Sequence, residues 1–178
     1  MIIFVKLLLA HVIGDFILQP NSWVLDKEKK VHRSPYLYWH TLLHGLLAFI
    51  IVGKIDFFGY AFVLALSHGF IDFLKLRFQQ KKTKRNWFIA DQLLHLVVLI
   101  VISLWYNDQV IDFSLLDNQF WIMVTAMVLL TKPTSIIIKN IISIWTPESK
   151  NKNDDSLENA GNYIGIFERL FVFCFIIT

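Results

Sequence analysis

The sequence has little cysteine and little charge. Its 178 residues include one cysteine, Cys174, so an internal disulfide and a zinc site built on cysteine thiolates are both excluded. The shortage of thiolates also argues against an iron–sulfur cluster. Charged residues make up only 17% of the chain, whereas 56% of it is hydrophobic and 16 residues are Phe. Soluble domains carry about 25% charged residues, so this composition argues against a soluble domain.

Long apolar segments recur along the whole chain. Runs of about 18 or more nearly uncharged residues are typical of transmembrane helices. We predict six such spans, at about residues 1–19, 36–54, 57–75, 88–106, 119–146 and 161–178. The expected fold is an all-α integral membrane protein with a single polytopic domain, residues 1–178. Its first four helices would form two hairpins, about 1–54 and 57–106, and helices five and six would occupy 119–178.

Lysine and arginine are unevenly distributed among the predicted loops. The loop between the third and fourth spans carries six bases, from Lys75 to Arg85, and no acid. The next loop carries Asp108, Asp112 and Asp117 and no base. Because cytoplasmic loops are enriched in Lys and Arg, we expect the basic loops in the cytoplasm and the N-terminus outside. The expected location is the cytoplasmic membrane, with the lipid bilayer as partner and no nucleic acid.

Four pairs of polar residues interrupt the first four spans. The pairs are His11 and Asp15, His40 and His44, His68 and Asp72, and Asp91 and His95. Each pair is spaced i, i+4, which puts both side chains on one helix face, one turn apart. The remaining histidine, His32, falls in a predicted loop and is expected to be solvated. Since buried Asp and His groups are costly in hydrocarbon, the eight residues are expected to face the inside of the bundle.

Counted from the cytoplasmic end of each span, the eight residues fall at two depths. His11, His44, His68 and His95 form a deep layer, and Asp15, His40, Asp72 and Asp91 form a layer about one helical turn nearer the cytoplasm. A hydrogen bond between helices explains a single polar residue in a membrane bundle, but eight in register favour a metal site. Imidazole and carboxylate suit Zn, Fe or Mn, so we predict one or two divalent metal ions at this cluster.

The polar pairs also reveal an internal repeat. Residues 7–19, LLLAHVIGDFILQ, align with residues 64–76, LALSHGFIDFLKL, which places His11 on His68 and Asp15 on Asp72. WHTLLHGLLAFII, from residue 39, aligns with ADQLLHLVVLIVI, from residue 90. Two hairpins of equal orientation predict a parallel repeat about an axis along the membrane normal, with the cluster on or near that axis.

The last two spans contain ionisable residues of their own. The fifth span is longer than the hydrocarbon requires, and Pro133 is predicted to kink it. Lys132 lies near mid-membrane, and Glu168 lies level with the deep histidines. Ionisable residues inside a membrane are functional candidates. The candidate catalytic residues are therefore Asp15, Asp72, Asp91, Lys132 and Glu168.

Six short motifs follow one another along the chain. They are AHVIGDFILQ, HTLLHG, SHGFID, DQLLH, TKPTSIIIK and AGNYIGIFERLFVF. Together they resemble, over nearly the whole chain, the bacterial membrane family catalogued as domain of unknown function 3307. The resemblance implies that the characteristic positions of the family are His11, Gly14, Asp15, Gln19, His40, His44, His68, Asp72, Asp91, His95, Lys132, Glu168 and Arg169. It implies a bacterial inner membrane and no established activity.

The chemistry of the cluster favours a metal-dependent hydrolase whose site opens toward the cytoplasm. A metal lowers the pKa of a bound water, and Asp15, Asp72 or Asp91 would orient that water or accept its proton. A lipid-like or phosphorylated substrate is expected, with Lys132, Lys139 or Arg169 neutralising its charge. The alternatives are a transporter or channel for a metal ion, proton or small solute, a di-iron lipid oxygenase and, last, a bis-histidine haem protein. Apolar outer halves of the first four spans favour a one-sided pocket over a path through the membrane.

Overall fold

The computed structural model describes residues 2–107, 118–142 and 155–177, and all of the regular structure in these ranges is helical. The helices longer than five residues are α1 (Ile2–Val12), α2 (Asn21–Lys30), α3 (Pro35–Val52), α4 (Phe58–Phe78), α5 (Lys84–Asn107), α6 (Asn118–Leu130), α7 (Lys132–Ile142) and α8 (Asp155–Ile177). Short 3-10 turns precede α3 and α4, at Val31–Arg33 and Ile55–Phe57. The chain forms two compact units, residues 1–125 and residues 126–178. The predicted all-α class is confirmed.

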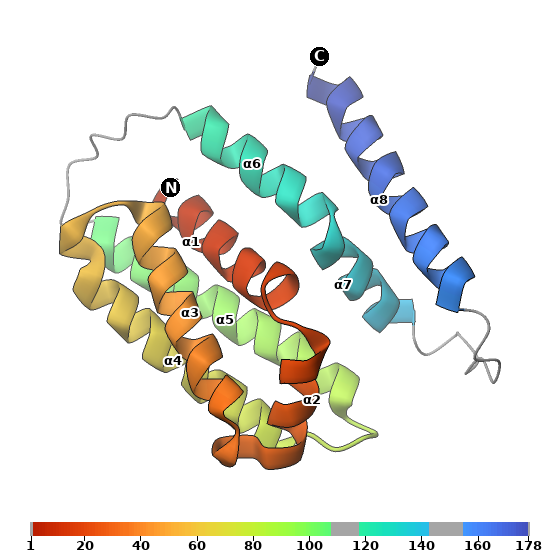
Figure 1. Ribbon diagram of the computed structural model, residues 1–178. Helices are drawn as coiled ribbons and strands as arrows, with labels where there is room; N and C mark the ends of the chain where they lie inside the picture. The colour runs from red at the N-terminus through yellow and green to blue at the C-terminus, as the bar shows by residue number, and fades with distance from the viewer. Residues whose placement is uncertain (1, 108–117, 143–154, 178) are drawn as a thin grey trace. The chain divides into compact units, whose positions relative to one another are not determined.

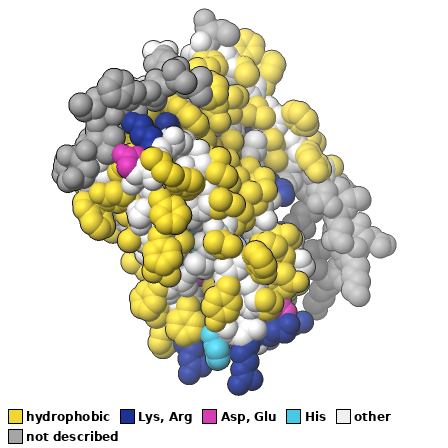
Figure 2. Space-filling view, turned by 60° about the vertical axis from the view of Figure 1, so that its left-hand side comes forward, with side chains coloured by type: hydrophobic (Ala, Val, Ile, Leu, Met, Phe, Trp, Pro, Cys, Tyr) yellow, Lys and Arg dark blue, Asp and Glu magenta, His cyan; other side chains and the backbone are white. Residues whose placement is uncertain are grey.

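Four helical segments are long and apolar enough to cross a membrane. They are Pro35–Val52, Ile55–Phe78, Lys84–Tyr106 and Ala160–Ile177. Two bent pairs of helices raise the number to six if each pair is one span. Large apolar side chains such as Ile50 and Leu104 are more than 60% exposed, as expected where lipid replaces water. Figure 2 shows hydrophobic side chains over most of one face, with Lys and Arg at its lower edge and a second group of them at the upper left.

In the first unit, four helices close into a ring. Helix α1 packs against α3 and α5, and α4 packs against the same two helices (Figure 1). Each helix turns one stripe of residues inward, with the histidines and aspartates toward one end of the bundle and mainly apolar side chains toward the other. The buried Lys6 of α1 lies at the apolar end, where its Nζ donates to the carbonyl of Val52 at 3.5 Å. The apolar part is the core, formed by Ile3, Leu7, Ala10, Ala48, Val52, Phe57, Ala61, Leu64, Leu99, Ile102 and Tyr106. The hydroxyl of Tyr106 donates to Asp56 at 3.1 Å near this end. The other end holds the histidines and aspartates.

The first predicted span differs from the structure at its end. The α-helix stops at Val12 and continues as one wider π-helical turn, Ile13–Ile17. Pro20 then has an extended backbone and starts α2, which is bent by 84° from the preceding helix. The segment NSWVLDKEKK falls between the first two predicted spans, where the sequence predicts a cytoplasmic loop rather than a helix. In Figure 1, α2 lies beside the ends of α3, α4 and α5.

The predicted kink in the fifth span is confirmed. Helices α6 and α7 are bent by 44° at Thr131, two residues before Pro133. Proline has no N–H for the carbonyl four residues earlier and its ring crowds that carbonyl. The Leu129 carbonyl accepts a hydrogen bond from the hydroxyl of Thr134 instead, at 2.5 Å. Residues 143–146 of the predicted span lie outside the described residues.

Candidate metal centre

Each of the four ring helices contributes one polar pair to the interior of the first unit. His11 is on α1 and Asp15 on the π-helical turn that continues it, His40 and His44 are on α3, His68 and Asp72 on α4, and Asp91 and His95 on α5. Seven of the eight residues are buried, and the Asp15 side chain is 11% exposed. None of the eight faces the lipid. The i, i+4 spacing therefore predicted the inward face of each helix correctly.

The four deep histidines converge, as predicted. The rings of His44 and His68 stack with their centroids 3.5 Å apart, and those of His68 and His95 stack at 4.1 Å. The ring of His11 lies 5.0 Å from that of His95 and 5.4 Å from that of His44. One small ion could therefore contact several of these imidazoles.

Asp15 lies at the centre of the cluster. Its Oδ1 is 3.0 Å from Nε2 of His40, 3.1 Å from Nε2 of His44 and 3.6 Å from Nε2 of His68. Its Oδ2 is 3.6 Å from Nε2 of His11. The two predicted layers are thus interlocked rather than separate, because a carboxylate of the shallow layer reaches imidazoles of the deep one. A wider π-helical turn carries Asp15, and such turns are frequent at functional sites.

Gly14 makes the close approach of α1 and α3 feasible. A Cβ atom at this position would lie 2.5 Å from Cε1 of His44, well inside van der Waals contact. Gly69 on α4 does the same for Thr41, whose hydroxyl oxygen would overlap with a Cβ there. Any side chain at Gly14 would displace the His44 ring, so this glycine is part of the site.

Two lysines that were not predicted as site residues pair with the cluster. Lys27 of α2 is buried, and its Nζ donates to Oδ2 of Asp72 at 2.8 Å. Lys75, in the last turn of α4, donates to Oδ2 of Asp91 at 2.8 Å. Lys75 follows Asp72 by one helical turn, so the spacing indicates that it lies on the same helix face as a cluster residue. Nothing local marked Lys27, because its position depends on the unforeseen helix α2.

Two glutamines complete the hydrogen-bond network. The side-chain amide of Gln92 donates to Oδ2 of Asp15 at 3.0 Å and to Oδ2 of Asp91 at 3.2 Å. The amide nitrogen of Gln19 lies 2.8 Å from Nε2 of His40. Gln19 was indicated by the family resemblance, whereas Gln92 was missed. Gln92 directly follows Asp91 in the motif DQLLH, and its amide reaches the carboxylate of this neighbour. No i, i+4 spacing marks this contact in the sequence.

Three groups of these residues have the geometry to hold a metal ion. Each group offers ligand atoms within 4.8 Å of one another. The groups are His11, Asp15, His44 and His68; His40, His68 and Asp72; and Asp72, Asp91 and His95. In the third group, Oδ1 of Asp91 and Nε2 of His95 are buried and have no hydrogen-bond partner among the described residues. Buried polar atoms of this kind are costly unless a ligand or ion satisfies them. The predicted ligands are brought together, and the donor set fits a divalent metal.

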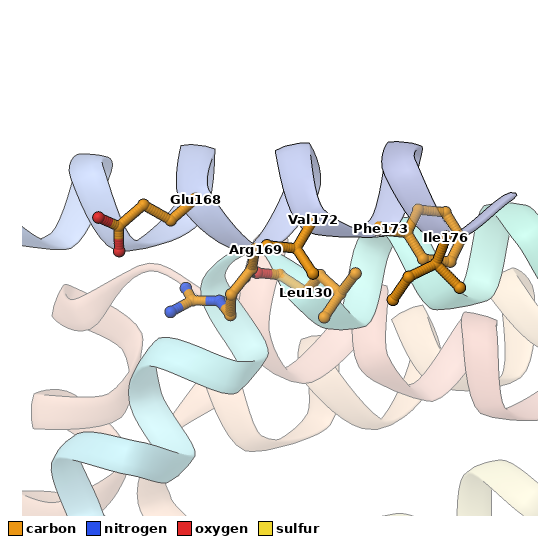
Figure 3. A pocket seen from close by; sticks show the side chains of 6 residues that line it. All are labelled: Leu130, Glu168, Arg169, Val172, Phe173 and Ile176. Carbon is orange, nitrogen blue, oxygen red and sulfur yellow. Dashed lines mark hydrogen bonds between the residues drawn. The ribbon is translucent and has the colours of Figure 1, made fainter. Parts of the chain in front are cut away.

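The remaining predicted site residues lie in the second unit. Arg169 of α8 donates from Nε to the carbonyl of Leu130 at 2.8 Å and from Nη2 to the hydroxyl of Ser135 at 2.7 Å. It thus binds α6 and α7 at their bend. A groove of about 300 Å³ runs beside it, with Glu168 and Arg169 at one end and Leu130, Val172, Phe173 and Ile176 along the rest (Figure 3). The catalytic roles expected for Lys132 and Glu168 stay predictions.

Comparison with known proteins identifies the family but no activity. No curated protein and no solved structure matches this chain. A family model described as a protein of unknown function (DUF3307) matches residues 3–124. The matched range contains the four ring helices, all eight cluster residues and both lysines that pair with them. The chain belongs to the DUF3307 family.

Proposed function

We propose that the protein is a membrane-embedded, metal-dependent hydrolase whose metal is held by His11, Asp15, His44 and His68. The proposal rests on which group pairs with each of the three carboxylates of the cluster. Asp72 and Asp91 each pair with a lysine at 2.8 Å. In the described part of the chain, the ion pairs of Asp15 are with histidines alone. A buried carboxylate among neutral imidazoles needs a cation, and a divalent metal supplies it.

The chain also provides groups that could handle a proton beside this metal. A divalent metal would lower the pKa of a coordinated water toward neutrality. Nε2 of His95 and Oδ1 of Asp91 lie 3.5 Å apart, and neither has a hydrogen-bond partner. His95 stacks on the proposed ligand His68, so this pair lies next to the metal group. We assign the Asp91–His95 pair as the proton acceptor, with Gln92 holding Asp91 and Asp15 in register.

The position of the cluster supports an enzyme over a transporter. Along all four ring helices the polar residues are followed, toward the other end, by the apolar core. A transporter needs polar groups or a changing opening on both sides of its site. The polar side of the cluster lies at the end of the bundle where α2 and the α4–α5 connection lie (Figure 1). We propose that this end faces the cytoplasm, in agreement with its basic residues.

Metal analysis of the purified full-length protein tests the proposal. We expect one or two Zn, Fe or Mn ions per chain, and an absorption spectrum without iron–oxo bands if the protein is a hydrolase rather than a di-iron oxygenase. His44→Ala should lose most of the bound metal. His32→Ala is the matched control, because His32 lies outside the cluster, and it should retain full metal. Protein that is metal-free, stable and indifferent to chelators would exclude the metalloenzyme and leave a proton path as the explanation of the cluster.

A further inference from the structure

Two ammonium groups approach the cluster from different helices. Lys27 is 4% exposed, although it belongs to the otherwise polar helix α2. The side chain of Lys75 is 23% exposed, so it lies nearer to the surface. Both donate to the Oδ2 atom of an aspartate, which leaves the Oδ1 atoms of Asp72 and Asp91 directed to His95 at 3.7 and 3.5 Å. The lysines thus border the cluster without occupying the positions of its imidazoles.

Each lysine is connected to Asp15 through one carboxylate and one further side chain. From Lys27 the connection runs through Asp72 to Nε2 of His40, at 3.7 Å, and from there to Oδ1 of Asp15, at 3.0 Å. From Lys75 it runs through Asp91 to the amide of Gln92, at 3.2 Å, and then to Oδ2 of Asp15, at 3.0 Å. The two connections end on the two oxygens of the same carboxylate. Both ammonium groups are therefore linked to the proposed metal group through Asp15.

With a metal bound, the formal charges of the site would not sum to zero. The two lysines neutralise Asp72 and Asp91, and histidines that bind metal are neutral. Asp15 then carries one negative charge, so a divalent metal leaves the buried site with one net positive charge. A buried net charge is costly until an ion of opposite sign joins it. An anion of one net charge, such as a singly protonated phosphate group, would neutralise the site.

The donors available to that anion indicate its chemistry. An ammonium has three N–H groups, and the described part of the chain records one hydrogen-bond acceptor for each of the two lysines. Spare donors therefore remain on both lysines. A carboxylate offers two oxygens, whereas a phosphate group offers three, one for the metal and one for each ammonium. Ammonium groups beside a metal are a common means of binding phosphate oxygens.

We propose that Lys27 and Lys75 bind a phosphate group next to the metal and that the substrate is a phosphate monoester. This inference rests on the proposed metal site. In the hydrolysis, the oxygen of water forms a new bond to phosphorus and the ester P–O bond breaks. One water proton goes to the departing alkoxide, which leaves as an alcohol, and the other stays on the phosphate. No oxidant or further reactant is required.

Phosphate binding to the full-length protein in detergent tests this inference. Metal-loaded and metal-free protein are dialysed against radiolabelled inorganic phosphate, and short-chain phosphatidic acid is used as competitor. We expect the metal-loaded protein to bind phosphate at least about tenfold more tightly, since metal and anion binding are reciprocally coupled. Stronger competition by phosphatidic acid than by unlabelled phosphate would identify a lipid phosphate as the source. Equal competition would identify a free or soluble phosphate group. Acetate should compete weakly.

Variants of the lysines separate charge from structure. Lys75→Gln should weaken phosphate binding at least about tenfold while the metal content stays unchanged, and Lys75→Arg should restore most of the binding. The double variant Lys75→Gln and Asp91→Asn removes the pair together, so it keeps the test valid if the single variant does not fold. Lys29→Gln, at an exposed lysine of α2, is the matched control. Protein that holds metal but binds no phosphate would refute this inference alone. Protein that holds no metal would refute the proposed function as well.

Discussion

At the scale of single residues, the cluster depends on a glycine, which has no side chain, as well as on its histidines and aspartates. Gly14 belongs to α1's π-helical turn and has the His44 ring where its Cβ would be, at 2.5 Å. At Gly59 in α4, apart from its own stretch of helix and its chain neighbours, no described atom lies within 4 Å of the corresponding position. The same substitution at these two glycines should therefore have opposite effects.

Gly14→Ala should reduce metal affinity by about ten- to a hundredfold, the range observed when the support of a metal ligand is lost. The reason is that the added methyl group moves the His44 ring away from Asp15. Gly59→Ala should leave the metal content unchanged and stabilise α4 slightly, by about 0.5–1 kcal/mol, because alanine is the better helix former. Metal titration and thermal unfolding of both variants in the same detergent measure these effects. Equal metal affinities in the two variants would contradict the assigned role of Gly14.

The metal ligands were predictable from the sequence, and their surroundings were not. Four i, i+4 pairs in apolar helices can be recognised without a structure, because helix periodicity fixes which residues share a face. Gln92 and Lys27 have no such pattern. Each reaches the cluster through contacts between residues far apart in the chain, Gln92 with Asp15 and Lys27 with Asp72. Polar networks of this kind depend on the final packing, so sequence periodicity does not reveal them.

At the scale of elements, one buried and one exposed ion pair join α2 to the described part of the bundle. The buried pair joins Lys27 to Asp72. An exposed pair joins Lys84 at the start of α5 to Glu28. Within α2 itself, Lys30 pairs with Asp26, and the Lys30 side chain is 55% exposed. Burial rather than the number of pairs should decide what each contributes to stability.

Lys27→Met should destabilise the protein by about 3–5 kcal/mol, because it leaves Asp72 buried without its ammonium partner. Lys30→Met removes an exposed pair of the same helix and should cost less than about 1 kcal/mol. Denaturant unfolding of the two variants in mixed micelles gives both values. A Lys27→Met variant as stable as Lys30→Met would mean that α2 does not cover the cluster in solution.

The sequence predicted the spans better than their ends. Apolar length identified α3, α4 and α5, and Pro133 identified the bend between α6 and α7. The π-helical turn after Val12 and the helix that begins after Pro20 were not foreseen. Both lie where the chain leaves the apolar part of the bundle, and there tertiary contacts rather than hydrophobic periodicity decide the local backbone.

At the scale of the whole molecule, the basic residues predict which end of the bundle faces the cytoplasm. Cys174 is the one cysteine of the chain, so Cys174→Ala gives a cysteine-free background for labelling. In that background, Lys82→Cys, between α4 and α5, should react with a membrane-impermeant thiol reagent only after the cells are opened. Lys54→Cys, between α3 and α4, should react in intact cells. Reaction of residue 82 from outside would reverse the proposed orientation.

The apolar core at one end of the four-helix ring closes that end of the centre. The proposed hydrolase would therefore be a blind well, with the packed residues of the core as its floor. The leaving alcohol and the phosphate must then depart by the route through which the substrate arrived. Both products would have to leave before the next substrate molecule could enter. Released product would compete with substrate for the site. Inorganic phosphate should therefore inhibit competitively with the ester, because both would occupy the same site.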